Sequence, residues 1–251
     1  MCWNCQLDAA AELCGISHRT AFEWRHRVFA SVARRQEAVR LSGRVWVDET
    51  YVTDAPLMGD PDWRPRRGLS RNKLCIAVAI DARKNMVAVV CGHGKPTSGR
   101  IRDALLGHVA PGSTIVHDRE KPHRALVRGA GGADESYRAD SRDPACLVGM
   151  EMVDSLCSWI KRHLRRFPGM RPEHLQDYLD WCVYLFRVKR DNERWPKLER
   201  VVRRLVMTDA SYRRSRGQSR HPFGLLIDSR KKWKKRSISW RRHHPPRPQG
   251  S

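Results

Sequence analysis

The sequence has few acidic residues beside its basic ones, and it lacks any long apolar run. Lysine and arginine number 49 against 27 aspartate and glutamate, which gives a net charge of +22. An excess of this size predicts a polyanionic partner, with nucleic acid the default and a membrane surface the alternative. No run approaches the ~18 apolar residues of a membrane-spanning helix, and no signal-peptide pattern opens the chain. We therefore expect a cytoplasmic protein that does not bind membranes.

Paired cysteine motifs are also lacking. The eight cysteines are scattered, and most lie in apolar runs, where a reduced cysteine acts as a small hydrophobic side chain. Cys2 and Cys5 have the C-x-x-C spacing of half a zinc site, but no second C-x-x-C or H-x-x-H pair supplies the other two ligands. We therefore expect no structural zinc at this pair.

Two short runs of β-forming residues end on acids. The first, RVWVDETY at residues 44–51, carries Asp48 and Glu49 near its end, and the second, STIVHD at residues 113–118, ends on Asp118. β-Branched and aromatic residues favour buried strands, and each run is too short for a helix. A single acid at a strand end is often a solvated turn residue, since burying an unpaired carboxylate is costly. Two acids at equivalent positions in two such runs favour a shared role.

A third acid lies on a predicted amphipathic helix. Residues 147–167 carry apolar side chains at intervals of three and four, from Leu147 to Phe167. Asp154 and Lys161 are seven residues apart on the adjacent polar stripe, so both project from one side of this helix. Two strand-end acids and one helical acid form a set that could gather metal ions, because Mg²⁺ prefers carboxylate oxygens.

The N-terminal region predicts two helices, over residues 8–31, joined by a turn at Gly15. Asp8 and Ser17 are the expected N-caps. The second helix has Ala21, Trp24, Val28 and Phe29 as its expected apolar face, and it also carries several polar and basic side chains. This pattern is typical of a helix-turn-helix, whose second helix enters the major groove, although an ordinary pair of antiparallel helices has the same outline. The basic charge favours DNA. The candidate contacts on the second helix are His18, Arg19, Thr20, Arg25 and Arg27.

A long polar loop is predicted over residues 52–72. It is rich in proline, glycine and arginine, and Trp63 lies among its basic residues, where an indole can stack on a base. A solvated basic loop explains the composition equally well. The candidate DNA contacts here are Arg64, Arg66, Arg67, Arg71 and Lys73.

After the N-terminal helices, the predicted elements follow the order β-β-β-α-β-α-β-α. Three meandering strands followed by alternation with helices predict an α/β fold, with a mixed sheet covered on both faces. Helices are also predicted over residues 173–190 and from Trp195 to about Met207. Over residues 211–251 thirteen basic side chains face one acid, so this tail is expected to be disordered unless it binds DNA.

The order of the acids, at the end of the first strand, after the fourth and on the helix after the fifth, is that of a ribonuclease-H-like catalytic domain. At the level of motifs, the chain resembles bacterial insertion-sequence transposases of the DDE class. The resemblance is carried by WVDETYV around Asp48, IVHD at Asp118 and MVDSLCSWIKRHLRRFPGM with Asp154 and Lys161, and it continues into HLQDYLDW. It covers residues 8–207.

The resemblance implies that Asp48, Asp118 and Asp154 are catalytic and bind Mg²⁺ or Mn²⁺, with two ions expected. Lys161 would contact the DNA backbone in the basic position of the family motif. The third acid of the family is usually Glu, or Asn in one subgroup, whereas this chain has Asp154. Glu151, one turn earlier, is therefore the alternative third ligand. Arg162 and Arg165 are further candidate DNA contacts.

These features predict a metal-dependent DNA transposase that cleaves phosphodiester bonds and transfers the strands of an insertion sequence. The expected division is a helix-turn-helix segment at 1–35, a linker at 36–43, a ribonuclease-H-like domain with a five-stranded sheet at 44–208 and a basic tail at 209–251. The expected partners are double-stranded DNA, both element ends and target, and other copies of the chain in a homo-oligomer on bacterial nucleoid DNA. Two alternatives stay open: a decayed transposase that only binds DNA, and a nuclease of the same fold.

Overall fold

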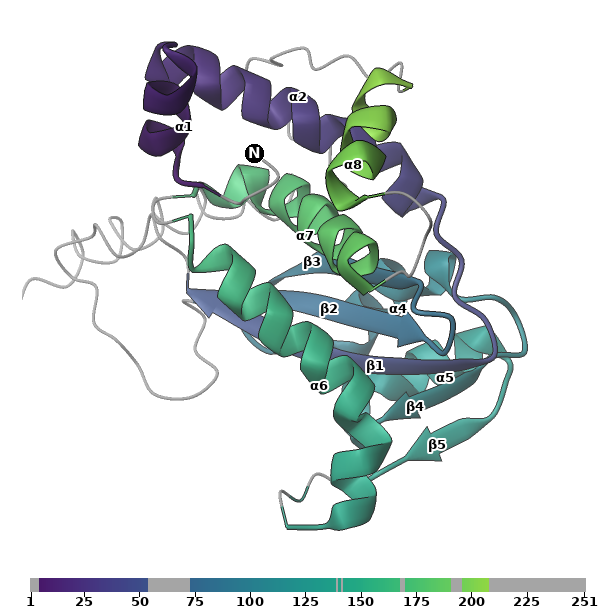
Figure 1. Cartoon of the computed structure of the whole chain (residues 1–251). Helices are drawn as coiled ribbons and strands as arrows, with labels where there is room; N and C mark the ends of the chain where they lie inside the picture. Colours follow the sequence, from purple (N-terminus) through teal and green to yellow (C-terminus); the bar gives the residue numbers. More distant parts are fainter. Residues whose placement is uncertain are drawn as a thin grey trace, which may run out of the picture. The chain divides into compact units, whose positions relative to one another are not determined.

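The computed structural model describes residues 5–53, 73–138, 140, 142–167, 170–190 and 196–207. Two helices come first, α1 over Leu7–Cys14 and α2 over His18–Glu37 (Figure 1). They are joined at Gly15, which ends α1 in the left-handed region at φ 61°. Only glycine adopts this conformation without a steric cost from Cβ. The predicted pair of helices is therefore confirmed, and α2 is longer than expected.

One of the two predicted N-caps is found in the structure and the other is not. Ser17 behaves as predicted, because the Thr20 backbone N–H donates to its Oγ at 3.1 Å. Asp8 does not cap α1. The N-cap is Gln6, whose side chain makes no capping bond, and Asp8 lies in the first helical turn. An acid in that turn still interacts favourably with the helix dipole, which explains the same sequence signal without a cap.

The sheet has five strands in the order β3-β2-β1-β4-β5. The strands are β1 Arg44–Thr53, β2 Lys73–Asp81, β3 Met86–His93, β4 Thr114–His117 and β5 Asp134–Ser136. β1 lies at the centre, antiparallel to β2 and parallel to β4, while β3 is antiparallel to β2 and β5 is parallel to β4. This mixed α/β sheet confirms the predicted fold class.

In the described residues, five more helices follow α2 along the chain, and those between and after the strands confirm the predicted alternation. They are α4 Ser98–Leu105, α5 Arg124–Ala130, α6 Pro144–Leu164, α7 Leu175–Arg190 and α8 Lys197–Val206, with short 3-10 helices at Leu106–His108, Lys121–His123 and Pro172–His174. Helix α6 begins earlier than predicted, because Asp143 caps it by accepting from the Ala145 backbone N–H and Pro144 occupies the first turn.

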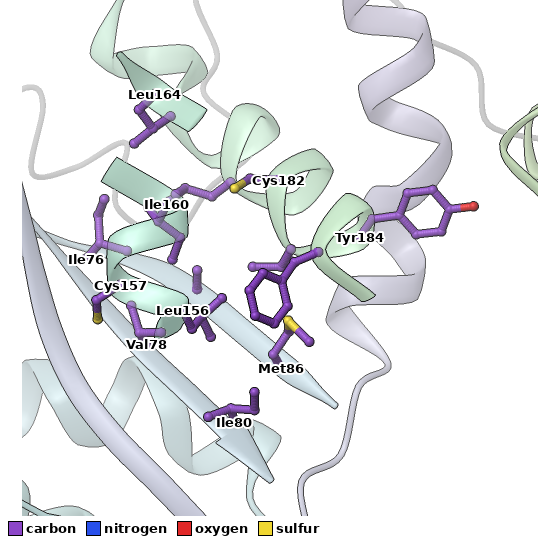
Figure 2. Packing of buried hydrophobic residues seen from close by; sticks show 14 of the residues in the cluster. Ile76, Val78, Ile80, Met86, Leu156, Cys157, Ile160, Leu164, Cys182 and Tyr184 are labelled. Atoms are coloured by element: carbon purple, nitrogen blue, oxygen red, sulfur yellow. The ribbon is translucent and has the colours of Figure 1, made fainter. Parts of the chain in front are cut away.

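Alternate side chains of the strands enter two separate cores. Trp46, Ile76, Val78 and Ile80 face α6 and α7, where they meet residues such as Leu156 and Ile160 (Figure 2). Their neighbours in sequence enter a second core with α4 and α5, made by Val45, Val47, Cys75, Ala77 and Ala79 among others. Period-two alternation on a central strand thus buries both faces. It also sends consecutive side chains of β1 to opposite sides, which matters for the acids below.

Helix α2 packs against α7 through aromatic side chains. The Phe29 ring lies 4.9 Å from that of Tyr178 and stacks on that of Trp181 at 5.6 Å between centroids. Trp24 was expected on the buried face of this helix, yet it is 51% exposed, and His26 is buried instead. The buried face is centred on Ala21, Arg25, Phe29 and Val32, which places Trp24 outside it.

The connector between α2 and β1 contributes to the core. Leu41 is fully buried and forms an isolated parallel bridge with Val109, with its N–H donating to the His108 carbonyl at 2.7 Å. The proposed division at residues 1–35, 36–43, 44–208 and 209–251 stays a prediction, and residues 208–251 lie outside the described part. In the part of the chain that is described, no helix combines the length and apolarity needed to span a bilayer.

Candidate active site

Asp48 lies on the central strand β1, on the face that packs against α6. The Cys157 thiol of α6 donates to Asp48 Oδ2 at 3.6 Å, which joins the helix to the strand at this point. Burial raises the pKa of Asp48 to about 7, and the negative charges of Glu49, Asp118 and Asp154 act in the same direction. A cation bound beside this carboxyl group would stabilise its ionised form, because it would offset the negative charges of the cluster.

Asp118 directly follows β4, the parallel neighbour of β1. Trp46 is paired with Val116 in the ladder, so Asp48 and Asp118 each come two residues after this pair in strands that run the same way. Parallel strands end at the same edge of a sheet, and this register brings the two acids to one place. Asp118 Oδ1 accepts from the Glu120 backbone N–H at 3.1 Å, which fixes its carboxylate.

Asp154 reaches the same cluster from helix α6. It is an exposed residue one turn before Cys157, whose thiol contacts Asp48. Partial burial raises the pKa of Asp154, Lys161 lowers it and Asp118 raises it. Lys161 therefore acts from the same side of the helix two turns later, as the spacing predicts. The structure thus brings Asp48, Asp118 and Asp154 close enough for their charges to interact, while Glu151 lies exposed one turn earlier on α6.

Sequence reasoning missed a buried ionic bridge behind these acids. His123 Nε2 lies 3.2 Å from Glu49 Oε1, and its Nδ1 lies 3.3 Å from Asp118 Oδ1. Burial lowers the pKa of His123, but its pairing with Asp118 and Glu49 outweighs burial and raises the pKa to about 9. An imidazolium therefore joins the two carboxylates. The signal in the sequence was Glu49 itself, since an acid next to Asp48 on a buried strand must face the opposite core and needs a cation there.

His117 adds a second imidazole beside this bridge. Its ring lies 5.0 Å from that of His123, and its Nε2 contacts Asp134 Oδ1 at 3.0 Å. Ligand atoms of His117, Asp118 and His123 all lie within 4.8 Å of one another. Both imidazoles already contact carboxylates, so their visible role is to hold the loop that follows β4.

A pocket of about 680 Å³ borders Asp118. Its lining includes the basic residues Lys95, Arg119 and Lys121 together with Thr97 and Ser98 at the start of α4. Lys95 Nζ is paired with Glu120 Oε2 at 2.7 Å, and Arg119 holds a left-handed backbone at φ 64°. Hydroxyl groups and basic side chains next to a carboxylate suit a phosphate-bearing ligand. Apart from Asp118, none of these lining residues was predicted to be part of a site.

The predicted DNA contacts of α2 separate into two groups. His18, Arg19 and Arg27 are exposed, whereas Thr20 is half-buried at the first turn. Arg25 differs from the expectation, because it is only 5% exposed, donates to the Cys5 carbonyl at 2.8 Å and lies 5.3 Å from the centre of the Phe167 ring. It is turned inward with the buried face of the helix. Its guanidinium contacts Cys5 in the N-terminal segment and Phe167 just after α6 rather than facing solvent.

The remaining predicted contacts lie on α6, at the start of β2 and among residues 64–71. Lys161, Arg162 and Arg165 are exposed on the last turns of α6, and Lys73 is half-buried at the first residue of β2. The other four, Arg64, Arg66, Arg67 and Arg71, lie outside the described residues.

Two comparisons with known proteins found proteins that are similar to this chain. A family model described as the ISXO2-like transposase domain matches residues 40–187. Among solved structures, the Mos1 strand transfer complex is 15% identical over 80% of this chain and 73% of that chain, with a TM-score of 0.28. The Mos1 mariner paired end complex with Mn is 14% identical over the same shares, with a TM-score of 0.24. None of the curated protein sequences matches the chain.

Proposed function

The chain belongs to the ISXO2-like transposase domain family, and from this membership we propose that it cleaves DNA at the ends of an insertion sequence and transfers the cut strands into target DNA. The observation that carries the proposal is the meeting of Asp48, Asp118 and Asp154 from two parallel strands and one helix. A basic pocket next to Asp118 supports it, because a DNA strand presents phosphates to such a surface.

The residues present fit a pair of divalent cations. Burial raises the pKa of Asp48 to about 7, and the charges of three nearby acids act in the same direction, so a cation there removes a repulsion that the fold maintains. Hard carboxylate oxygens select Mg²⁺ or Mn²⁺. Asp48, Asp118 and Asp154 would hold the ions, with Glu151 as the alternative to Asp154. Two such ions activate the attacking oxygen and stabilise the leaving oxygen of a phosphodiester.

The protein's own side chains have three tasks in this proposal. The Glu49–His123 pair holds Asp118 in place from the opposite face of the sheet. Cys157 keeps Asp48 in contact with α6, so that strand and helix keep one geometry. Lys161 supplies a positive charge beside Asp154 that a DNA phosphate can share, which positions the strand without proton transfer.

DNA binding is assigned to separate surfaces. Helix α2 presents His18, Arg19 and Arg27 for the element ends, and Arg162 and Arg165 extend the basic side of α6. The basic residues over 211–251 would add contacts that do not depend on sequence. Pairing two ends requires more than one copy, so the active form would be a homo-oligomer on bacterial chromosomal DNA.

A cleavage assay on the element's own ends tests the proposal. With Mg²⁺ or Mn²⁺ the wild-type protein should cut the end and join it to a target duplex, and Asp48→Ala or Asp118→Ala should abolish both steps while leaving DNA binding nearly unchanged. Cutting without joining would indicate a nuclease of this fold. Binding without cutting would indicate a decayed transposase, and either result would overturn the proposal.

The same assay decides the third ligand. Asp154→Ala should lose activity by several orders of magnitude. Asp154→Glu should retain or raise activity, because Glu is the usual third acid in the transposases that this chain resembles. Glu151→Ala is the matched control on the same helix and should cleave normally. If Glu151→Ala is inactive while Asp154→Ala cuts, then Asp48, Asp118 and Glu151 form the site.

A further inference from the structure

A second cluster of ligand-type side chains lies where α2 meets the start of α7. It consists of His26 from α2, His174 from the 3-10 helix before α7 and Asp177 from the first turn of α7. One ligand atom of each lies within 4.8 Å of the other two. The acids of the candidate active site come from other elements, β1, the end of β4 and α6, so this cluster has no part in the function proposed above.

One distance in the cluster equals the ligand spacing of a tetrahedral metal site, and a second is somewhat longer. The Nδ1 atoms of both histidines face one carboxylate oxygen, Asp177 Oδ2, at 3.3 Å from His26 and 3.9 Å from His174. Ligands about 2.0–2.1 Å from a tetrahedral zinc ion are roughly 3.3 Å from one another. His26 Nδ1 and Asp177 Oδ2 are within hydrogen-bond distance, at the long end of the usual range. A shared ion would replace this hydrogen bond at nearly the same separation of the two atoms.

The burial of the three side chains leaves one side open. The His26 side chain is 0% exposed, while those of His174 and Asp177 are 29% and 32% exposed. Aromatic rings enclose His26, with Phe22 at 4.4 Å and Tyr178 at 5.9 Å between centroids. Two exposed ligands give an ion a path from solvent and leave room for water as a fourth ligand. The buried imidazole would anchor the ion against the protein interior.

The types of side chain in the cluster also suit a transition metal. Two imidazoles and one carboxylate form a set preferred by zinc-class transition metals, whereas Mg²⁺ favours oxygen ligands alone.

We propose that His26, His174 and Asp177 bind one transition-metal ion of the zinc class, which fastens helix α2 to helix α7. The ion would link residue 26 of α2 to residues 174 and 177 at the start of α7, which are about 150 positions later in the sequence. Its effect would be to stabilise the docking of the N-terminal helices, separately from the Mg²⁺ or Mn²⁺ chemistry.

The experiment uses the full chain with Zn²⁺ as the probe, in excess Mg²⁺ so that the acidic site is occupied. Bound zinc is counted by elemental analysis after gel filtration, and Tm is measured with and without Zn²⁺. At about 100 times the dissociation constant, one site should raise Tm by roughly 5–10 °C for a chain of this size. His174→Ala and Asp177→Asn should bind one ion fewer and lose most of this shift. Both residues are partly exposed, so the variants should fold.

A matched control lies at the start of α2. His18 and Asp8 form an exposed pair with Nε2 3.4 Å from Oδ1, but no third ligand completes it in the described residues. His18→Ala should therefore bind zinc as the wild type does. Equal zinc content and equal Tm shifts in His174→Ala and the wild type would overturn the proposal. Substituting Co²⁺ gives a second readout, because a thiolate charge-transfer band that persists in His174→Ala would place the ion on cysteines instead.

Discussion

A buried histidine on the helix that carries Asp154 should make the protein sensitive to mild acid. His163 is 3% exposed, and neither ring nitrogen has a hydrogen-bond partner among the described residues. Burial, with the charge of Arg166, lowers the pKa of His163 from 6.5 to about 4. At about 1.4 kcal/mol per unit, this difference corresponds to about 3 kcal/mol in the free energy of unfolding.

The sign follows from proton binding. Because the pKa of His163 is lower in the folded protein, the unfolded chain binds more protons between pH 6.5 and about 4. The contribution to stability is therefore fully present above pH 6.5 and is lost as the pH falls toward 4. Asp48 titrates in an overlapping range with the opposite sign, since its pKa is raised to about 7. The effect of His163 is therefore measured as the difference in the free energy of unfolding between the wild type and a variant that lacks this histidine.

The measurement is urea unfolding of the wild type and of His163→Leu at several pH values. Leucine is similar in volume and needs no hydrogen bond, so the variant should be at least as stable at pH 7. Between pH 7 and 4 its advantage should grow by about 3 kcal/mol. His18→Leu, an exposed histidine on α2, is the control and should show no such growth. A constant difference between wild type and His163→Leu across this range would refute the reasoning.

Three further results are expected. His123→Ala should destabilise the fold by about 3–5 kcal/mol in urea unfolding, because it leaves the buried Glu49 unpaired; an unchanged midpoint would contradict the ionic bridge. Arg25→Ala should lower Tm without changing the salt dependence of DNA binding. Arg27→Ala should reduce the salt dependence of DNA binding and leave Tm nearly unchanged. The opposite pattern would show that Arg25 contacts DNA. Gly149→Ala should cost about 1–3 kcal/mol although alanine favours helices, since its Cβ would lie 2.4 Å from the Tyr137 ring; Tyr137→Ala should relieve this, and no rescue would argue against the clash.

The sequence predicted those parts of the fold that depend on local pattern. The runs around Val47 and Ile115 alternate or cluster in the way that buried strands require, and each carries its acid at a fixed distance along the strand. Parallel pairing of the two strands then brings Asp48 and Asp118 together. The helical spacing of Asp154 and Lys161 was enough to place both on one side of α6.

Tertiary contacts decided what the sequence could not predict. The orientation of α2 depends on which of its sides meets α7, so Trp24 and Arg25 exchanged their expected positions, one outward and one inward. The bridge from Glu49 through His123 to Asp118 joins residues more than seventy positions apart. The His26, His174 and Asp177 cluster spans an even longer separation. None of these pairings has a period or a motif that a single sequence displays.

The alternation of Asp48 and Glu49 on β1 limits how this region can change over evolutionary time. The two acids are chemically similar, but Asp48 faces α6 and Glu49 faces His123. Each acid therefore makes its contacts on one face of the sheet only. A single-residue insertion or deletion between Arg44 and Val47 would exchange them while keeping the same charges. β1 is hydrogen-bonded on both edges, so neither neighbour could follow such a slip without losing its own pairing. A substitution alters one side chain on one face of β1, whereas a change in length would move every following side chain of the strand to the opposite face.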